Sequence, residues 1–430
     1  MRRLAGLERG PADNCRGRGR FVALDGAAIW FTMAVTNLRF GQQMAAIPGP
    51  SIIPQRVLEA MARPMTDLYG GPVVETSARI REQLPSIAAT SGHAFIVNSN
   101  GHGAWQMATS NTLARGDKVL VLESGRFATT WGVYTSVSEI EVEVLPGSFR
   151  GPVDPATLEA RLAADTAHEI KAILCVHVDT ASSVRNDIPA LRAAIDAANH
   201  PALFMVDCIA SMGCEEFLMD EWGVDVAVAG CQKGLMVPPG IAFVWASEKA
   251  VAAHERADMR IGYLDWEQRI HGENQYQYYA GTPPMAHLFA LEVALELVDE
   301  EGGWRNVWDR HTALSDAVKA AVTAWSHPDG LEFNITNAES RANCVTTVLS
   351  NKIDALAFRE ICEHQAGLVL GVGIADVNGF RIAHMGHLNA PMILGTLGTV
   401  EAVLAATGAP TGGSGVAAAA AVLGAALKSN

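Results

Sequence analysis

The sequence lacks the marks of several classes of protein. No apolar run approaches the length needed to span a bilayer, because the longest candidate, near the C-terminus, consists mainly of alanine and glycine. Aromatic residues make up only 7% of the chain and the formal net charge is -14, so there is no basic stripe for nucleic acid. We therefore expect neither membrane insertion nor a nucleic-acid partner.

Cysteine is scarce and its spacing is not that of a metal site. The chain has 7 cysteines, an odd number, and most of them lie in apolar runs without the paired spacing of a zinc site. This pattern predicts reduced, buried thiols, a cytoplasmic protein and no bound metal. The cysteines are Cys15, Cys175, Cys208, Cys214, Cys231, Cys344 and Cys362.

What is present is the pattern of an α/β protein. From about residue 90, short apolar runs alternate with longer helical periods, which predicts a βαβ series and a mainly parallel sheet. Helices are expected at 154–165, opened by Asp154 as a cap, and at 188–199. The predicted strands are 94–99, 118–124, 141–146, 171–178, 202–207, 225–230 and 241–247.

The chain divides by composition into four parts. Residues 1–44 are rich in arginine and turn formers and are expected to be a disordered extension, and Met33 and Met44 are alternative starts. Residues 45–299 form the expected large domain. Strand patterns at 344–350, 368–374 and 380–386 predict a smaller α+β domain over 300–407. The low-complexity tail, 408–430, is expected to be a flexible appendage.

Two charged residues interrupt the apolar part of the predicted sheet. Asp207 ends an apolar run, where a buried carboxylate is costly unless it meets a cation. Lys233 follows the next strand, so both can reach one edge of the sheet. An aspartate facing a pyridinium nitrogen and a lysine able to form a Schiff base are what pyridoxal phosphate requires of a protein. The alternatives are a helix cap or core ion pair for Asp207 and a surface loop for Lys233.

A glycine-rich segment at 100–103 follows the first predicted strand. Glycines at the junction of a strand and a helix let the backbone approach a phosphate, with the helix N–H groups aimed at the anion. Taken alone, the segment is a weak signal, and an ordinary strand-to-helix turn is the better interpretation of it. Trp105, on the helix that follows, is interpreted as a packing residue.

Five motifs in order resemble one enzyme family. The chain is similar, over roughly residues 45 to 405, to the class V, fold-type I pyridoxal phosphate aminotransferases, in particular the alanine-glyoxylate and serine-glyoxylate group. Several ordered motifs are far more specific than any single one. The motifs are IPGPSIIP at 47–54, SNGHGAWQMA at 99–108, VDCIASMG at 206–213, GCQKGLMVPPG at 230–240 and FRIAHMG at 380–386.

The resemblance implies roles for particular residues. Lys233 would be the lysine that holds the cofactor covalently, and Asp207 the partner of its ring nitrogen. Phe127 takes the place of the aromatic residue, commonly tryptophan, that stacks on the ring. Arg381 matches the arginine that clamps the substrate carboxylate, which suits its bidentate geometry. The other implied cofactor contacts are Asn100, Gly101, His102, Gly103, Thr180 and Gln232.

The resemblance also implies a homodimer with shared active sites. The segment YYAGTPP is similar to the one through which a neighbouring subunit completes the phosphate site, which gives that role to Tyr279 and Thr282. Tyr69, in TDLYGGP, lies where family members place residues near a partner's substrate, so it is a candidate for lining the substrate site.

The implied activity moves an amino group from alanine, serine or aspartate to glyoxylate or pyruvate. The loop 179–183 departs from the pattern of the alanine-glyoxylate and serine-glyoxylate group, because it lacks the glycine that usually ends it. Its sequence is similar to that of the pyridoxamine-pyruvate aminotransferase branch of the same group. Two further alternatives are a lyase or desulfurase of the same fold, which would need a reactive cysteine on a mobile loop, and a noncatalytic nucleotide-binding protein. The last would leave Lys233 and Arg381 without a role.

Overall fold

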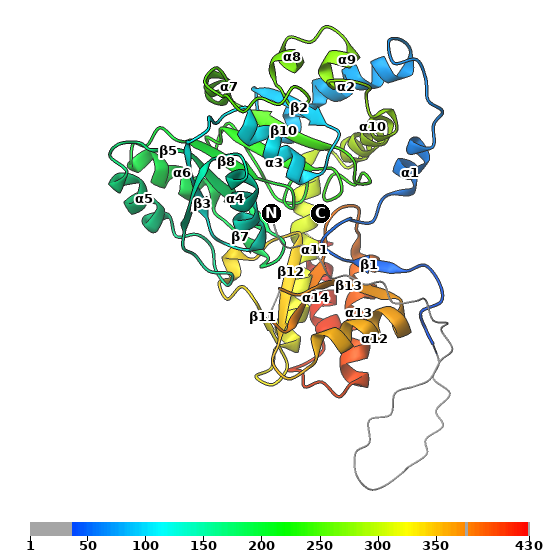
Figure 1. Cartoon of the computed structure of the whole chain (residues 1–430). Coiled ribbons are helices and arrows are strands. Elements are labelled where there is room, and N and C mark those ends of the chain that lie inside the picture. The colour runs from blue at the N-terminus through cyan, green and yellow to red at the C-terminus, as the bar shows by residue number, and fades with distance from the viewer. Residues whose placement is uncertain (1–36, 375–376, 429–430) are drawn as a thin grey trace, which may run out of the picture. The chain divides into compact units, whose positions relative to one another are not determined.

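Two large β-sheets and a two-stranded ribbon organise the part of the chain that the computed structural model describes, residues 37–374 and 377–428 (Figure 1). The prediction for residues 1–36, and Cys15 with it, lies outside the described residues. Within the predicted extension, the described stretch near residue 38 is tied down, because the Leu38 amide donates to the Gln365 carbonyl at 2.9 Å. Residues 38–430 cluster as one unit.

The seven-stranded sheet confirms the predicted mainly parallel α/β fold. All seven predicted strands are present, and only β10 runs antiparallel to its neighbours β2 and β9. In spatial order the strands are β2 (His93–Val97), β10 (Ala242–Ala246), β9 (Val226–Gly230), β8 (Leu203–Asp207), β5 (Ile170–Val176), β3 (Lys118–Leu122) and β4 (Glu141–Leu145).

Helices cover both faces of this sheet because successive strand side chains point to opposite sides. On β8, Phe204 and Val206 join one hydrophobic core, whereas Leu203 and Met205 join the other. Helices of the first core are α1 (Gln55–Met61), α2 (Pro72–Ile87), α5 (Pro155–Ala164), α6 (Ile188–Ala197) and α10 (Met285–Glu300). Helices of the second are α3 (Gly101–Ser110), α4 (Arg126–Ser136) and α7 (Glu248–His254), and the short α8 (Glu267–Ile270) and α9 (Gln275–Tyr278) follow.

The two helices expected from the sequence begin where their capping residues predict. The Asp154 carboxylate accepts from the amides of Ala156 and Thr157 at the start of α5, and Asp187 caps α6 through the Ala190 amide. Proline stands at the first turn of both helices, where its missing N–H costs nothing.

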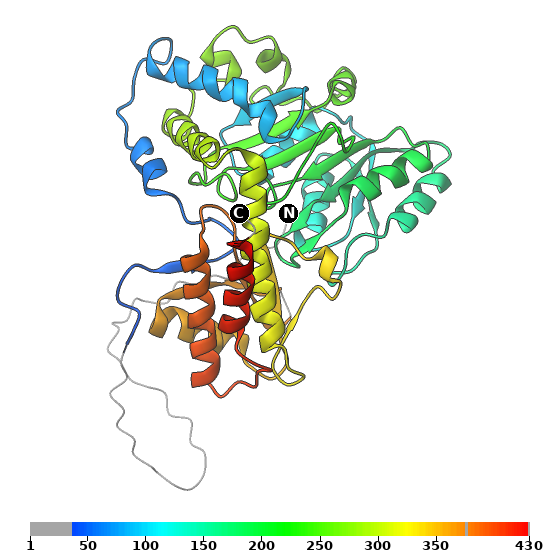
Figure 2. The same ribbon diagram turned by 180° about the vertical axis from the view of Figure 1, so that it is seen from behind.

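The five-stranded sheet joins chain segments that lie far apart in the sequence. Its first strand, β1 (Met44–Ala46), pairs in parallel with β13 (Leu368–Val372), so the start of the described chain completes a sheet built from its end. The other strands are β14 (Gly379–Ala383), β12 (Val345–Ser350) and β11 (Leu331–Phe333). The helices α11 (Trp304–Trp325), α12 (Ala355–Ala366) and α13 (Ala390–Ala406) share its core (Figure 2).

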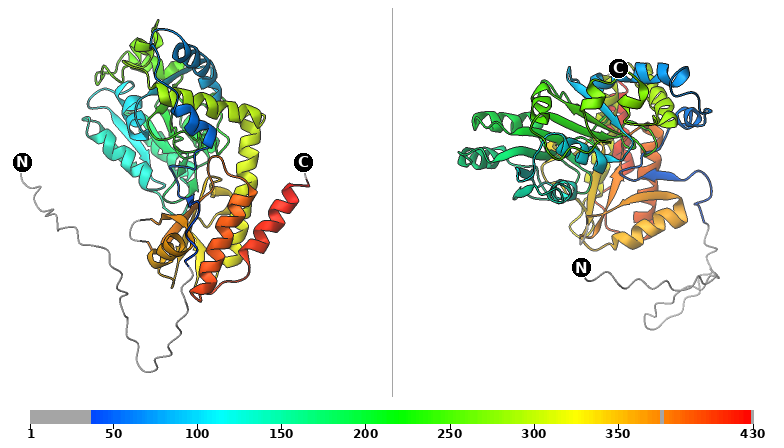
Figure 3. Two further views of the ribbon diagram at one scale, coloured as in Figure 1. Left: turned by 90° about the vertical axis from the view of Figure 1, so that its right-hand side faces the viewer. Right: turned by 45° about the horizontal axis from the view of Figure 1, so that its top comes forward.

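The C-terminal tail is not a flexible appendage along most of its length, which corrects the expectation above. Residues Gly415–Ala426 form helix α14, which lies beside α11 and α13 (Figure 3). Leu423 and Ala419 are buried there, and Glu401 on α13 accepts from the Ser414 hydroxyl at 2.7 Å. A run of alanines favours a helix, and low complexity concealed this propensity.

Candidate active site

The strands of the large sheet end at one shared pocket. Asp207 ends β8, Lys233 follows β9, Thr180 follows β5, and the 100–103 segment follows β2 and begins α3. This edge is the one where parallel sheets bind ligands. The pocket, of about 160 Å³, is lined by Asn100, Gly101, His102, Trp105, Phe127, Val176, Val178, Thr180, Asp207, Ile209, Ala210, Gln232 and Lys233.

Lys233 is held in the pocket by the loop that follows β1. The Ser51 hydroxyl donates to the Lys233 carbonyl at 2.7 Å, and the Lys233 ammonium donates to the Pro48 carbonyl. A side chain at Gly49 would overlap the lysine side chain, so this close approach requires glycine. Burial lowers the pKa of Lys233 to about 8, which raises the share of neutral, nucleophilic amine at physiological pH.

Asp207 is buried and takes one hydrogen bond on each carboxylate oxygen. The Ile209 amide donates to Oδ1 at 2.6 Å, and the Trp105 indole Nε1–H donates to Oδ2 at 2.9 Å. Burial raises the pKa of Asp207 to about 7, against the effect of these two donors and of Lys233. Trp105 is thus more than the packing residue expected from the sequence, because it contacts the key carboxylate directly.

The glycine-rich segment forms the start of α3 as expected. The Asn100 side chain accepts from the His102 amide at 3.0 Å and caps the helix. A Cβ at Gly101 would overlap Ile209, and one at Gly103 would overlap Ser99. Within residues 100–103, only Gly103 does not line the pocket.

Gln232, another residue predicted to contact the cofactor, carries an unsatisfied polar atom. Its Oε1 is buried and has no hydrogen-bond partner among the described residues. Because amide oxygen and nitrogen exchange places by a flip of the group, Gln232 can turn either an acceptor or a donor toward a ligand. An unpaired amide in a pocket that also holds Asp207 and Lys233 fits pyridoxal phosphate.

Asp179 organises two walls of the pocket, and sequence reasoning did not select it as a site residue. Its Oδ2 accepts from the Phe127 amide at 2.7 Å at the start of α4, and its Oδ1 accepts from the Ala181 amide at 2.9 Å. One buried carboxylate therefore places both Phe127 and the loop that carries Thr180. A Cβ at Gly125 would overlap this carboxylate. The glycine directly before α4 is thus the sequence feature that could have pointed to a close contact with Asp179.

The loop after Thr180 keeps a left-handed residue although it lacks the expected glycine. Ser183 has φ 64, a conformation that glycine adopts most easily. Its hydroxyl bonds with that of Thr347 on β12 and its carbonyl accepts from Ala342, so tertiary contacts hold the turn in place.

Arg381 lies on β14 and reaches the edge of the pocket without lining it. Its Nη1 donates to the carbonyl of Thr180 at 2.8 Å and its Nε to the carbonyl of Val372. Burial lowers the pKa of Arg381 to about 10, and its charge in turn lowers the pKa of Lys233. The guanidinium of Arg381 therefore lies directly behind Thr180, which lines the pocket.

Three residues assigned by resemblance do not reach this pocket in their own chain. Tyr279 is buried, and its hydroxyl forms a 2.7 Å hydrogen bond with Ser77, so it is already engaged in its own core. Thr282 and Tyr69 are exposed on the surface. Their assignment to a neighbouring subunit stays a prediction.

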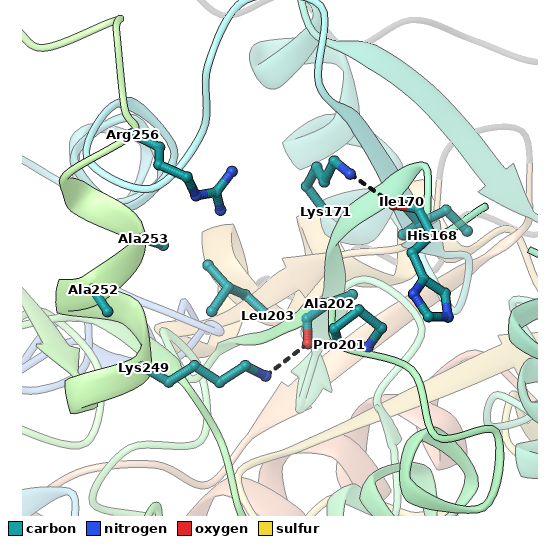
Figure 4. A pocket seen from close by; sticks show the side chains of 10 residues that line it. All are labelled: His168, Ile170, Lys171, Pro201, Ala202, Leu203, Lys249, Ala252, Ala253 and Arg256. Atoms are coloured by element: carbon teal, nitrogen blue, oxygen red, sulfur yellow. Dashed lines mark hydrogen bonds between the residues drawn. The ribbon is translucent and has the colours of Figure 1, made fainter. Parts of the chain in front are cut away.

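A second pocket, of about 410 Å³, lies at the opposite ends of β5 and β8 (Figure 4). Lys171, Lys249 and Arg256 line it, but none of the predicted site residues does. Lys249 is bound to the Ala202 carbonyl and to Asp225, and Lys171 to the His168 carbonyl. The pocket is larger than the one at Lys233 but contains no comparable set of reactive groups.

The described residues contain no cluster of side chains able to hold a metal ion and no helix suited to cross a membrane. The six described cysteines are free and buried. Cys344, beside β12, and Cys362, within α12, have pKa values raised by burial, with Cys362 at about 12. A desulfurase would need an accessible thiolate, which neither residue provides.

Comparison with known families agrees with this geometry. Residues 46–377 match the model of the family Aminotransferase class-V. The chain belongs to this family. Its members depend on pyridoxal phosphate, so the chain is a pyridoxal phosphate-dependent aminotransferase of fold type I.

Relatives match almost the whole chain. The serine–glyoxylate aminotransferase of Methylorubrum extorquens is 38% identical over 91% of this chain and 98% of its own length. The L-aspartate–glyoxylate aminotransferase of Paracoccus denitrificans is 36% identical over 87% and 94%. Ureidoglycine-glyoxylate aminotransferase from Bacillus subtilis shares the fold, with a TM-score of 0.80 at 24% identity over 89% of this chain and 98% of that one. Pyridoxamine-pyruvate aminotransferase from Mesorhizobium loti shares it with a TM-score of 0.79 at 24% identity, over 90% and 98%.

Proposed function

We propose that this aminotransferase moves the amino group of a small amino acid, serine, aspartate or alanine, to glyoxylate or pyruvate. The observation that carries the proposal is the similarity, over nine tenths of the chain, to relatives that use serine or aspartate with glyoxylate. We further propose that the enzyme works in the cytoplasm as a homodimer.

The residues that would hold the cofactor surround the pocket. The start of α3, with Asn100, Gly101 and His102, would bind the phosphate together with Gln232. Phe127 would pack on the ring, and Thr180 would contact it. When bound, pyridoxal phosphate withdraws electrons from the α-carbon of the substrate.

We propose that Lys233 transfers protons during the reaction and that Asp207 keeps the ring nitrogen of the cofactor protonated. With its pKa lowered to about 8, Lys233 can lose a proton, attack a carbonyl carbon and later move the substrate's α-proton. Asp207, fixed by its two donors, would accept the hydrogen bond of the ring N–H and keep that nitrogen protonated. Removal of water from both groups strengthens each interaction.

Arg381 is proposed to bind the α-carboxylate. The carbonyls of Thr180 and Val372 orient its guanidinium, which leaves further N–H groups for two parallel bonds to a carboxylate. None of the residues lining the pocket is an arginine, and Arg381 lies beside it. A second carboxylate, as in 2-oxoglutarate, would have no matching cation there.

A panel of substrates tests the proposal. Alanine, serine and aspartate are each paired with glyoxylate, pyruvate and 2-oxoglutarate, and kcat/KM is measured for every pair. Glyoxylate or pyruvate should be preferred as acceptor. A clear preference for 2-oxoglutarate would contradict the proposal, and rapid use of pyridoxamine as donor would favour the pyridoxamine-pyruvate alternative.

A further inference from the structure

Neighbouring aromatic rings hold the indole of Trp105 against Asp207. Trp105 is 1% exposed and stacks on Trp131, with ring centroids 5.8 Å apart and an angle of 11° between the planes. The ring of His102 meets it edge-on at 4.7 Å. The Nε1–H therefore cannot swing away from Oδ2 of Asp207, to which it donates at 2.9 Å.

An indole N–H can discriminate between the two protonation states of this carboxyl group. It is a donor only, so it stabilises an ionised oxygen and cannot accept from a protonated one. The Ile209 amide, on the other oxygen, is also a donor only. Each oxygen retains a lone pair after these bonds, so Asp207 can still accept a third hydrogen bond from a ligand in the pocket.

We propose that Trp105 is a positioning residue that keeps Asp207 ionised and aimed at the ring nitrogen of the cofactor, and so sets the affinity for that cofactor. The inference rests on the role proposed above for Asp207. It concerns only residues of this chain, and it adds a role for Trp105, the side chain that donates to Asp207.

The charged and titratable neighbours of Asp207 do not replace Trp105 in this role. Asp179, from the short strand β6 (Val178–Asp179), raises the pKa of Asp207, whereas Lys233, after β9, lowers it. The thiols of Cys175 on β5 and of Cys208 have pKa values raised by burial, so they stay neutral near pH 7. The two hydrogen bonds, from Ile209 and Trp105, oppose burial more than Lys233 does.

The test compares Trp105→Phe with Trp131→Phe in the full-length enzyme freed of cofactor. Trp131 lies in the same aromatic stack, but its Nε1 has no hydrogen-bond partner among the described residues, so it is a matched control. The probe is pyridoxamine phosphate, whose amine cannot join Lys233 covalently. Its dissociation constant is measured by equilibrium dialysis between pH 6 and pH 9.

Trp105→Phe should raise that constant by about tenfold or more, as the loss of a hydrogen bond to a charged group predicts. Without the donor, the pKa of Asp207 rises above its value of about 7, so the acid-side loss of affinity should begin at higher pH. Trp131→Phe should not change the pH at which the acid-side loss of affinity begins. The titration of the ligand's own phosphate is common to all variants and cancels in the comparison.

Two further variants separate the possible failures. Replacement of Trp105 by 3-benzothienylalanine keeps the ring shape and removes only the N–H, so it decides the matter if Trp105→Phe does not fold. Asp207→Asn should remove the part of the pH dependence of the dissociation constant that comes from ionisation of Asp207. If Asp207→Asn changes the profile but neither Trp105 variant does, the inference is wrong; if Asp207→Asn also changes nothing, the proposed role of Asp207 itself is wrong.

Discussion

At the scale of single residues, the site holds charges that burial disfavours. Burial lowers the pKa of Lys233 to about 8 and raises that of Asp207 to about 7, so each group is moved toward its neutral form. Perturbed values of this kind are typical of functional sites, where the fold accepts a cost in stability for reactivity.

The cost of burying Lys233 should be visible in the pH dependence of unfolding. Between pH 8 and 10.5 the unfolded chain, with an ordinary lysine pKa, binds more protons than the folded one, so stability should rise with pH across this window. Lys233→Met should therefore stabilise the cofactor-free protein at pH 7, by on the order of 3 kcal/mol, and this gain should shrink toward pH 10.

Urea unfolding at fixed protein concentration and several pH values measures this difference. Lys428→Met, at an exposed position, is the control and should show no such trend. A stability difference between Lys233→Met and the native chain that is independent of pH would contradict the lowered pKa.

Removing Arg381 should weaken the binding of every carboxylate substrate. Arg381→Ala leaves that carboxylate without its partner in a partly desolvated site, so kcat/KM for amino and keto acids should fall by roughly a hundredfold or more. Arg381→Lys should recover little, because an ammonium cannot form two parallel bonds. An equal loss with pyridoxamine, which has no carboxylate, would show that the arginine acts in another way.

At the scale of elements, the C-terminal helix α14 is an integral part of its sheet's core. Leu423 packs there at 7% exposure, whereas Leu427, one turn later, is 77% exposed. Leu423→Ala should destabilise the protein by about 2 kcal/mol or more, as for other buried leucines. Leu427→Ala, the same change at an exposed position just beyond the end of the helix, should have little effect.

Thermal unfolding of the two variants makes the comparison. Activity per folded molecule should be unchanged in both, since α14 contributes no residue to the pocket at Lys233. Equal melting temperatures for both variants would mean that α14 does not pack as described.

At the scale of the whole molecule, a dimer is expected to complete the phosphate site. Sedimentation should show a dimer at micromolar concentration. Thr282→Ala should weaken cofactor binding, because the exposed hydroxyl is proposed to reach the phosphate of the neighbouring subunit. Thr166→Ala, another exposed threonine, is the control. A stable, active monomer would refute the role given to Thr282.

Much of the large sheet could be predicted because its signals are local. Most strands are largely apolar runs of five to seven residues, β4 alternates glutamate with valine, and Asp154 and the proline after it mark the start of α5. Asp207 and Lys233 could be found for the same reason, since each is a charge at the end of an apolar run. The alanine-rich tail was misjudged, because its partner α11 is remote in the sequence.

The sequence by itself determined which residue types end the strands, and thus the chemistry available at that edge. Only the tertiary structure decided which of them meet: that Trp105 donates to Asp207, that Asp179 holds Phe127 and the Thr180 loop together, and that Arg381 reaches the pocket through the Thr180 carbonyl. It also decided that β1 pairs with β13. These contacts depend on the direction of buried side chains and on pairing between distant segments, and neither leaves a periodic pattern in the sequence.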